Sequence, residues 1–361
     1  MLVHVLAIFQ CNFHDMECVE FESGEVLKKY FIAISIFILM VGLGAVVISQ
    51  VGIKKSFIVA VLIAVMALTG CQNVKAEGSQ GVSDHLVMER ITLPAQFKNP
   101  DGSSYMAELD ALVVRPDDHQ AHPLAVINYP HIENPKNVYA DDWEKQTKEF
   151  ARRGWVAVAF TARGYGLSEG QPVGQVKECS DSEFVRSAQV RADDVREVMR
   201  LMAEKTYVDH TKIISIALGI SGYTMLSLVA EPSPGLVAVI TFAGGWTARK
   251  TEMVACYNQS QINTAAGFGK SARIPMLWIV AENDNIVPLS LLKEMHAAFN
   301  KGGGKAELLV TPPFETDAHF IFSKRPSIWG PLIYNFLQKQ NLQQRRDLIP
   351  LTYIRMEYEN P

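Results

Sequence analysis

Cysteine and positive charge are both scarce in this sequence of 361 residues. The five cysteines stand singly and form no Cys-x-x-Cys pair, so the ligand spacing of a structural metal site is missing and no metal is predicted. The 34 lysine and arginine residues are outnumbered by 38 acidic residues, which leaves a net charge of -4. This balance lacks the basic surface that DNA or RNA requires, so nucleic acid is not an expected partner.

Internal repeats and low-complexity segments are also lacking, while a hydrophobic fraction of 48% is ample for a large buried core. One glycine-rich stretch, Arg163 to Gly170, follows an expected strand. It has neither the lysine of a P-loop nor the G-x-G-x-x-G spacing of a dinucleotide site. We therefore predict no cofactor, and we expect this stretch to be a structural turn on the rim of the functional site.

Hydrophobic residues are concentrated in the first 70 residues of the chain. Phe31–Ser49 is an uncharged apolar run of about 19 residues, long enough to cross a bilayer. A shorter run, Phe57–Leu68, follows the basic pair Lys54-Lys55 and ends just before Cys71. A basic pair, an apolar run and small residues in this order are typical of a secretory signal.

The four residues Leu68-Thr-Gly-Cys71 resemble the lipobox of bacterial lipoproteins. That resemblance implies that Cys71 is lipidated, becomes the first mature residue and anchors the protein to the cell envelope, with the rest facing the periplasm or the exterior. Some fifty residues precede this signal, so either translation starts later than Met1, which we favour, or a transmembrane helix comes first. We divide the chain into a leader (1–70), a linker (71–84), a catalytic domain (85–340) and a tail (341–361).

The remaining cysteines fit export. Beyond the leader and Cys71, only Cys179 and Cys256 are left, an even number suited to one disulfide in an oxidising compartment. Both lie in connections that start at the carboxyl edge of the expected sheet, so we predict that they are bonded to each other. The alternative is two unrelated buried thiols.

Apolar strands and amphipathic helices alternate from residue 85 onward. This alternation predicts an α/β fold, with a mostly parallel central sheet of about eight strands flanked by helices. The first two strands surround an Asp101-Gly102 turn and predict an antiparallel edge. The expected strands are 86–94, 106–115, 124–128, 155–160, 213–218, 236–242, 276–280 and 307–310, and the expected helices are 141–153, 187–205, 223–230, 289–299 and 328–338.

Three chemically complementary residues each follow an expected strand. Ser221 lies in a strand-to-helix turn, Asp284 follows a later strand and His319 follows the last one. A serine hydroxyl needs a base to take its proton and an acid to orient that base, and the order Ser, acid, His is that of the α/β-hydrolase triad. The carboxyl ends of parallel strands share one edge of the sheet, so we expect the three side chains to meet there.

Each member of this triad has a competing interpretation. The turn has Gly219 two residues before the serine, but Tyr223 stands where the G-x-S-x-G pattern expects its second glycine. The serine could instead be an ordinary helix cap. His131 is a rival for the base, and Glu282 and Asp317 are rivals for Asp284.

Stabilising the negative charge on an acyl oxygen requires hydrogen-bond donors aimed at it. The backbone N–H of Gly222 is the expected first donor. The second is expected just after the strand that ends at Asn128, where Pro130 has no N–H. Tyr129, through its hydroxyl or its N–H, and the N–H of His131 remain as alternatives.

Residues 113–338 resemble the α/β-hydrolase superfamily, most of all its dienelactone hydrolase-like and X-Pro dipeptidyl-peptidase-like (cocaine-esterase-type) branches. The resemblance rests on Ala162-Arg-Gly-Tyr-Gly-Leu-Ser-Glu-Gly170, Val208-Asp209, Phe242-Ala-Gly-Gly245, Glu282-Asn-Asp284 and Asp317-Ala-His319. It implies the hydrolase fold, the triad roles of Ser221, Asp284 and His319, and hydrolysis of esters or related acyl bonds. In the peptidase branch a tyrosine hydroxyl helps to hold the oxyanion, a role for which Tyr129 is the nearest candidate.

The sequence therefore predicts an exported serine hydrolase that cleaves a carboxylic ester of a small molecule through an acyl-enzyme on Ser221. Two alternatives stay open: a peptidase acting on short peptides, and a catalytically inactive binding protein with a hydrolase fold. The substrate and the oligomeric state are not predicted, because loops set the shape of the pocket.

Overall fold

The structure is a computed structural model that describes residues 85–99, 101–128, 135–246, 253–342, 348–349 and 354–358. The expected leader and its two apolar runs, the lipidation site Cys71, and the oxyanion candidates Tyr129 and His131 lie outside the described residues. Within the described ranges, no helix is both long and apolar enough to cross a bilayer.

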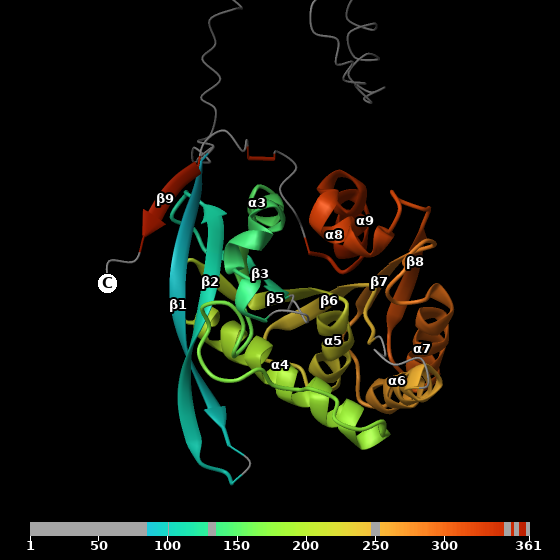
Figure 1. Ribbon diagram of the computed structural model, residues 1–361. Helices are drawn as coiled ribbons and strands as arrows, with labels where there is room; N and C mark the ends of the chain where they lie inside the picture. The colour runs from blue at the N-terminus through green and yellow to red at the C-terminus, as the bar shows by residue number, and fades with distance from the viewer. Residues whose placement is uncertain are drawn as a thin grey trace, which may run out of the picture. The chain divides into compact units, whose positions relative to one another are not determined.

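A single mixed sheet forms the centre of the unit that spans residues 80–361 (Figure 1). The strand order is β8-β7-β6-β5-β3-β4-β2-β1-β9. Strands β3 to β8 run parallel to one another, while β2 is antiparallel to both β1 and β4. The strands are β1 (Leu86–Lys98), β2 (Ser104–Pro116), β3 (His122–Asn128), β4 (Val156–Phe160), β5 (Val208–Leu218), β6 (Leu236–Phe242), β7 (Met276–Ala281), β8 (Ala306–Thr311) and β9 (Ile354–Tyr358).

Helices cover both faces of the sheet, as the crossover connections of a parallel sheet require. Figure 1 shows α3, α8 and α9 over one face and α4, α5, α6 and α7 over the other, in agreement with the contacts within each group. The helices are α3 (Glu144–Ala151), α4 (Asp181–Ala203), α5 (Ile220–Ala230), α6 (Val254–Gly269), α7 (Leu289–Lys301), α8 (Ile321–Lys324) and α9 (Pro326–Lys339).

The inner strands are apolar because both of their faces are buried. Every residue of β4 (VAVAF) and of β7 (MLWIVA) is buried. Continuous apolar runs of this kind are what parallel strands between two helix layers require. The prediction of a mostly parallel, helix-flanked α/β sheet is thus confirmed.

Strand β9 and helix α6 are among the described elements that were not expected. Strand β9 (Ile354–Tyr358) lies in the segment expected to be a tail, and it adds a ninth described strand by pairing parallel with β1. Helix α6 (Val254–Gly269) lies between two expected strands where no helix was predicted. Its buried positions include Ser260, Gln261 and Thr264, so polar side chains interrupt the apolar stripe that usually indicates a helix.

The disulfide between Cys179 and Cys256 is present, as the sequence predicts. The Cα atoms of the two cysteines are 6.2 Å apart, within the range that a disulfide spans. Cys179 lies just before α4 and Cys256 lies in the first turn of α6. The bond therefore ties together the starts of two helices on the same face of the sheet.

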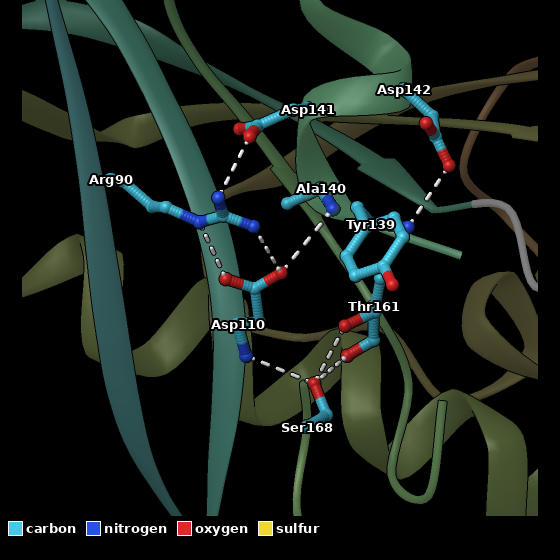
Figure 2. A network of polar contacts seen from close by, with 8 residues as sticks. All are labelled: Arg90, Asp110, Tyr139, Ala140, Asp141, Asp142, Thr161 and Ser168. Carbon is cyan, nitrogen blue, oxygen red and sulfur yellow. Dashed lines mark hydrogen bonds and ion pairs between the residues drawn. The ribbon is translucent and has the colours of Figure 1, made fainter. Parts of the chain in front are cut away.

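The glycine-rich stretch after β4 is a structural turn. The guanidinium of Arg163 donates to the buried carboxylate of Asp194 at 2.5 Å, and the backbone N–H of Arg163 donates to the same carboxylate at 2.9 Å. The Ser168 hydroxyl donates to the carbonyl of Thr161 at 2.7 Å and accepts from the N–H of Asp110 at 2.9 Å (Figure 2). These bonds close the turn onto β2 and α4.

A second ion-pair group fixes the segment after β3. The carboxylate of Asp110 accepts from the Arg90 guanidinium at 3.1 Å and from the N–H of Ala140 at 3.3 Å (Figure 2). Arg90 also donates to Asp141 at 2.8 Å, and its hydrogen bond with the Asp110 carboxylate raises the pKa of the guanidinium. Together these contacts anchor the short helix Ala140–Trp143 to the antiparallel edge of the sheet.

Candidate active site

The acid and the base of the predicted triad meet at the carboxyl edge of the sheet. Asp284 follows β7, and His319 lies in a short 3-10 helix, Ala318–Phe320, after β8. The Nδ1 atom of His319 lies 3.0 Å from Oδ2 and 3.2 Å from Oδ1 of Asp284. Only 5% of the His319 side chain and 1% of the Asp284 side chain are exposed. The pair is therefore close enough for a hydrogen bond and shielded from solvent.

Backbone groups hold the Asp284 carboxylate in place. Its Oδ1 atom accepts from the N–H groups of Ile286 and Val287, both at 2.8 Å. The carboxylate is thereby fixed at the turn that leads into α7, with Oδ2 turned toward the imidazole. A proton on Nδ1 of His319 donates to this carboxylate, which leaves Nε2 free to accept a proton.

The rival acids have other positions. The Oδ1 atom of Asp317 accepts from the N–H of His319 at 3.0 Å and from the N–H of Asn285 at 3.1 Å, so its carboxylate caps the 3-10 helix and ties two loops together. Glu282 is exposed. The structure therefore pairs the imidazole with Asp284 and gives Asp317 the separate task of positioning the backbone of His319.

The strand-to-helix turn has its sharpest bend at Gly219. This residue has φ 58° and ψ −127°, a strained region of backbone space that residues with a side chain rarely adopt. Its N–H donates to the carbonyl of Phe242 at 2.9 Å, and its carbonyl accepts from the N–H groups of Tyr223 and Gly245. Helix α5 begins at the next residue, so the backbone N–H groups of residues 220–222 precede the first helical bond and mark the positive end of the helix.

Ser221 lies in the first turn of α5, one residue beyond the start of the helix. It is 1% exposed, and no hydrogen bond joins it to His319 among the residues that the structure describes. The Nε2 atom of His319 instead faces Gly219: a Cβ on that residue would lie 3.5 Å from it. The structure thus brings Asp284 and His319 together and aims the imidazole at the bend, whereas Ser221 lies two residues further along.

The structure explains how a tyrosine fits the turn. Gly222 lies against β6, where a Cβ on it would come within 2.7 Å of the Gly244 Cα. Tyr223 points the other way, toward α6, where its hydroxyl lies 2.6 Å from the hydroxyl of Thr264. The tyrosine is fully buried, and this burial raises the pKa of its hydroxyl. The residue that must be small for helix and sheet to approach is therefore Gly222.

A described cavity of about 860 Å³ lies away from this site. Its lining includes His210 near the start of β5 and Ala230 at the end of α5, which place it at the amino edge of the sheet. Asp284 and His319 are at the opposite edge. Within the described ranges, no three His, Cys, Asp or Glu side chains are grouped so that they could hold a metal ion.

Comparisons with known proteins agree with this architecture. Residues 101–269 match the X-Pro dipeptidyl-peptidase (S15) family, a range that contains Gly219 and Ser221 but ends before Asp284 and His319. Esterase 2 of Thermogutta terrifontis is 16% identical in its solved structure, with a TM-score of 0.50 over 71% of this chain and 97% of that one. The chain has the α/β-hydrolase fold.

Other solved structures are similar to this chain at low identity. A putative dienelactone hydrolase from Klebsiella pneumoniae is 15% identical, with a TM-score of 0.49 over 71% of this chain and 98% of that chain. An acylaminoacyl peptidase from Pyrococcus horikoshii is 17% identical, with a TM-score of 0.47 over 71% of this chain and 42% of that one. A comparison with curated proteins gave no match.

The bend at Gly219 is the feature of this site that sequence reasoning missed. The sequence predicts the nucleophile at Ser221, because this serine lies in a strand-to-helix turn and is followed by Asp284 and His319 in the order of the triad. The signal that would have located the bend is the frame Ala217-Leu-Gly219-Ile-Ser221, in which small residues stand two positions before and two positions after Gly219.

Proposed function

We propose that this α/β-hydrolase cleaves a carboxylic ester of a small molecule, with His319 as the base and Asp284 as the acid that orients it. The observation that carries the proposal is the shielded contact of 3.0 Å between Nδ1 of His319 and Oδ2 of Asp284. It is supported by the orientation of the imidazole, whose Nε2 atom faces the bend before α5.

The two side chains divide the work of proton transfer. Asp284 keeps the Nδ1 proton of His319 in place and stabilises the imidazolium that forms when Nε2 accepts a proton. Nε2 takes that proton from the hydroxyl group that attacks the acyl carbon, and later gives it to the departing alcohol. In this scheme the N–H groups of residues 220–222, which precede the first helical bond of α5, donate to the negative charge that develops on the acyl oxygen.

Two hydroxyl groups can serve as the attacking group in this scheme. The sequence predicts the side chain of Ser221, which would form an acyl-enzyme that water then hydrolyses. Water acting directly is the alternative. The variant Ser221→Ala separates them, because only the first mechanism loses its nucleophile.

The test of the proposed function is a comparison of histidine variants on a short-chain p-nitrophenyl ester. His319→Ala should lower kcat/KM by about 10²-fold or more, since general base catalysis contributes about 10²–10⁴-fold. His210→Ala is the matched control, because His210 is exposed and lies at the amino edge of the sheet. Equal activity of the two variants and the wild type would refute the role of His319.

A peptidase is the second enzymatic candidate, and the family match favours it, because the matched family is described as an X-Pro dipeptidyl-peptidase. An X-Pro p-nitroanilide tested beside the p-nitrophenyl ester separates the two. Preference for the anilide, measured as kcat/KM, would replace the ester proposal with a peptidase.

A binding protein without turnover is the candidate from another class. The observation in its favour is the position of Ser221, which is 1% exposed and makes no hydrogen bond with His319 within the described part of the chain. Complete lack of turnover on both substrates, with a correctly folded protein, would support this candidate over the enzymatic ones.

We also propose that the protein works outside the cytoplasm, attached to the cell envelope through a lipid on Cys71. The disulfide between Cys179 and Cys256 supports export, because such bonds persist in oxidising compartments and are rare in the cytosol. The lipid itself remains a prediction from the four residues that end at Cys71.

A further inference from the structure

The bend at Gly219 has the backbone geometry that α/β-hydrolases give to their nucleophile. In that fold the nucleophile sits at the strained residue between strand and helix, so that its side chain stands clear of both. Here β5 ends at Leu218, Gly219 alone has the strained conformation (φ 58°, ψ −127°), and α5 starts at Ile220. Ser221 is already helical and lies beyond the strained position.

The space in front of His319 also fits a side chain at position 219. A Cβ there would lie 3.5 Å from Nε2 and 3.7 Å from Cε1 of His319, which is ordinary van der Waals contact. An oxygen one bond further could come within the roughly 2.6–3.2 Å that a nucleophile and its base require. Crowding therefore does not require a glycine at position 219. It does require one at position 222, because a Cβ on that residue would come within 2.7 Å of Gly244.

The neighbouring residues fit the same frame. The G-x-S-x-G pattern needs small residues two positions before and two positions after the nucleophile. Centred on Gly219, these positions are Ala217 and Ser221, both small and both buried. In this frame Ser221 is a small, buried residue in the first turn of α5, next to the close approach at Gly222.

We propose that Gly219 occupies the nucleophile position, and that His319 acts there on a water molecule instead of on a serine. This inference rests on the proposed ester hydrolysis. Nε2 of His319 removes a proton from the water, and the water oxygen bonds to the acyl carbon. The tetrahedral intermediate then expels the alkoxide, which takes the proton from His319 and leaves as the alcohol. The products are one acid and one alcohol, and no covalent acyl-enzyme forms.

The experiment installs the missing hydroxyl. Gly219→Ser is compared with Gly219→Ala, which carries the same backbone strain without the oxygen, and with Ser221→Ala. Each variant is first checked for a melting temperature close to that of Gly219→Ala. The readouts are labelling by a fluorophosphonate, located by peptide mass spectrometry, and the first turnover of p-nitrophenyl acetate.

The expected results differ sharply between variants. The wild type, Gly219→Ala and Ser221→Ala take up no label, and Ser221→Ala hydrolyses the ester within about twofold of the wild type. Gly219→Ser is labelled at position 219 and releases a burst of about one equivalent of p-nitrophenol, the signature of an acyl-enzyme. Adding His319→Ala to Gly219→Ser abolishes both.

Three results would overturn the inference. The first is labelling of the wild type at Ser221 that Ser221→Ala removes. The second is a folded Gly219→Ser variant that takes up no label. The third is a wild type without ester hydrolysis, which refutes the water step and the proposed function together. The failures of the two proposals are distinguishable. Labelling of the wild type at Ser221, with hydrolysis that His319→Ala abolishes, refutes the inference and leaves the proposed function standing. Hydrolysis that His319→Ala leaves unchanged refutes the proposed function and the water step, and labelling of Gly219→Ser would then still assign the nucleophile position to Gly219.

Discussion

Replacing Gly222 with alanine tests the packing that sets the bend in place. The added Cβ would lie 2.7 Å from the Cα of Gly244, about 1 Å closer than the 3.5–4.0 Å at which two carbons attract best. The obstacle is backbone on both sides, so neither partner can rotate away. Overpacking of this kind costs about 1–3 kcal/mol, even after the gain of up to about 1 kcal/mol that alanine brings to a helix. We expect the free energy of unfolding to fall by about 1–3 kcal/mol.

A second glycine in a helix supplies the control. Gly267 lies in α6, and a Cβ on it would meet nothing within 4 Å, so Gly267→Ala should leave stability unchanged or raise it by up to about 1 kcal/mol. Both variants are compared by urea unfolding with the disulfide intact, and by melting temperature, where 1 kcal/mol corresponds to about 2–4 °C. If Gly222→Ala is as stable as Gly267→Ala, α5 does not approach β6 as closely as described, and the contrast between Gly222 and Gly219 loses its basis.

Three further predictions concern the rest of the chain. Replacing Cys179 and Cys256 together with serine should lower the free energy of unfolding by about 2–4 kcal/mol, because the bond closes a loop across a sequence separation of 77; unchanged urea midpoints would argue against it. Mass spectrometry of the membrane-bound protein should find an acylated Cys71 at the N-terminus, and an intact leader would contradict the lipid anchor. Hydrogen bonds from the Arg186 guanidinium and the Lys177 N–H lower the pKa of Glu183 from 4.5 to about 2. Glu183 therefore adds stability above pH 4.5 that is lost as the pH falls toward 2, and Glu183→Gln should remove that part of the pH dependence of urea unfolding.

Much of the sheet could be predicted from sequence because burial on both faces leaves an unbroken apolar run. The runs that became β4 and β7 are of this kind, and their order with the helices indicated a parallel sheet. The pairing of Asp284 with His319 followed from the same reasoning, since parallel strands end at one edge. Helix α6 was missed because its buried face includes polar side chains. Gln261 faces inward and accepts from the N–H of Trp246 at 2.6 Å, and a buried amide interrupts the apolar stripe from which a helix is predicted.

The position of the bend does not follow from hydrophobic periodicity. Periodicity shows which residues are buried, but it does not show which residue has a positive φ. A glycine, a serine and a second glycine occur within four residues, and each could be placed at the bend by residue type alone. The backbone decides: the carbonyl of Gly219 accepts the first helical bond, from Tyr223, so the helix begins directly after it. The role of Tyr223 was hidden for a related reason, because the hydroxyl of Thr264 that it meets lies 41 residues away.

The cost of burying Asp284 and His319 argues for chemistry at this site over a purely structural role. Removing two polar, ionisable side chains from water is expensive, and an apolar pair of similar volume often makes a more stable core. Here the Asp284 carboxylate also uses two backbone N–H donors, from Ile286 and Val287, to hold its orientation. An imidazole that served only as packing would not need its second nitrogen turned toward the bend, where a Cβ on Gly219 would lie 3.5 Å away. A base requires one ring nitrogen that is held in orientation and a second that faces the reacting group, and His319 has the first nitrogen on Asp284 and the second turned toward the bend. If the base acts on the Ser221 hydroxyl, the reaction passes through an acyl-enzyme, and if it acts on water, no acyl-enzyme forms. If it acts on neither, the protein binds its ligand without turnover.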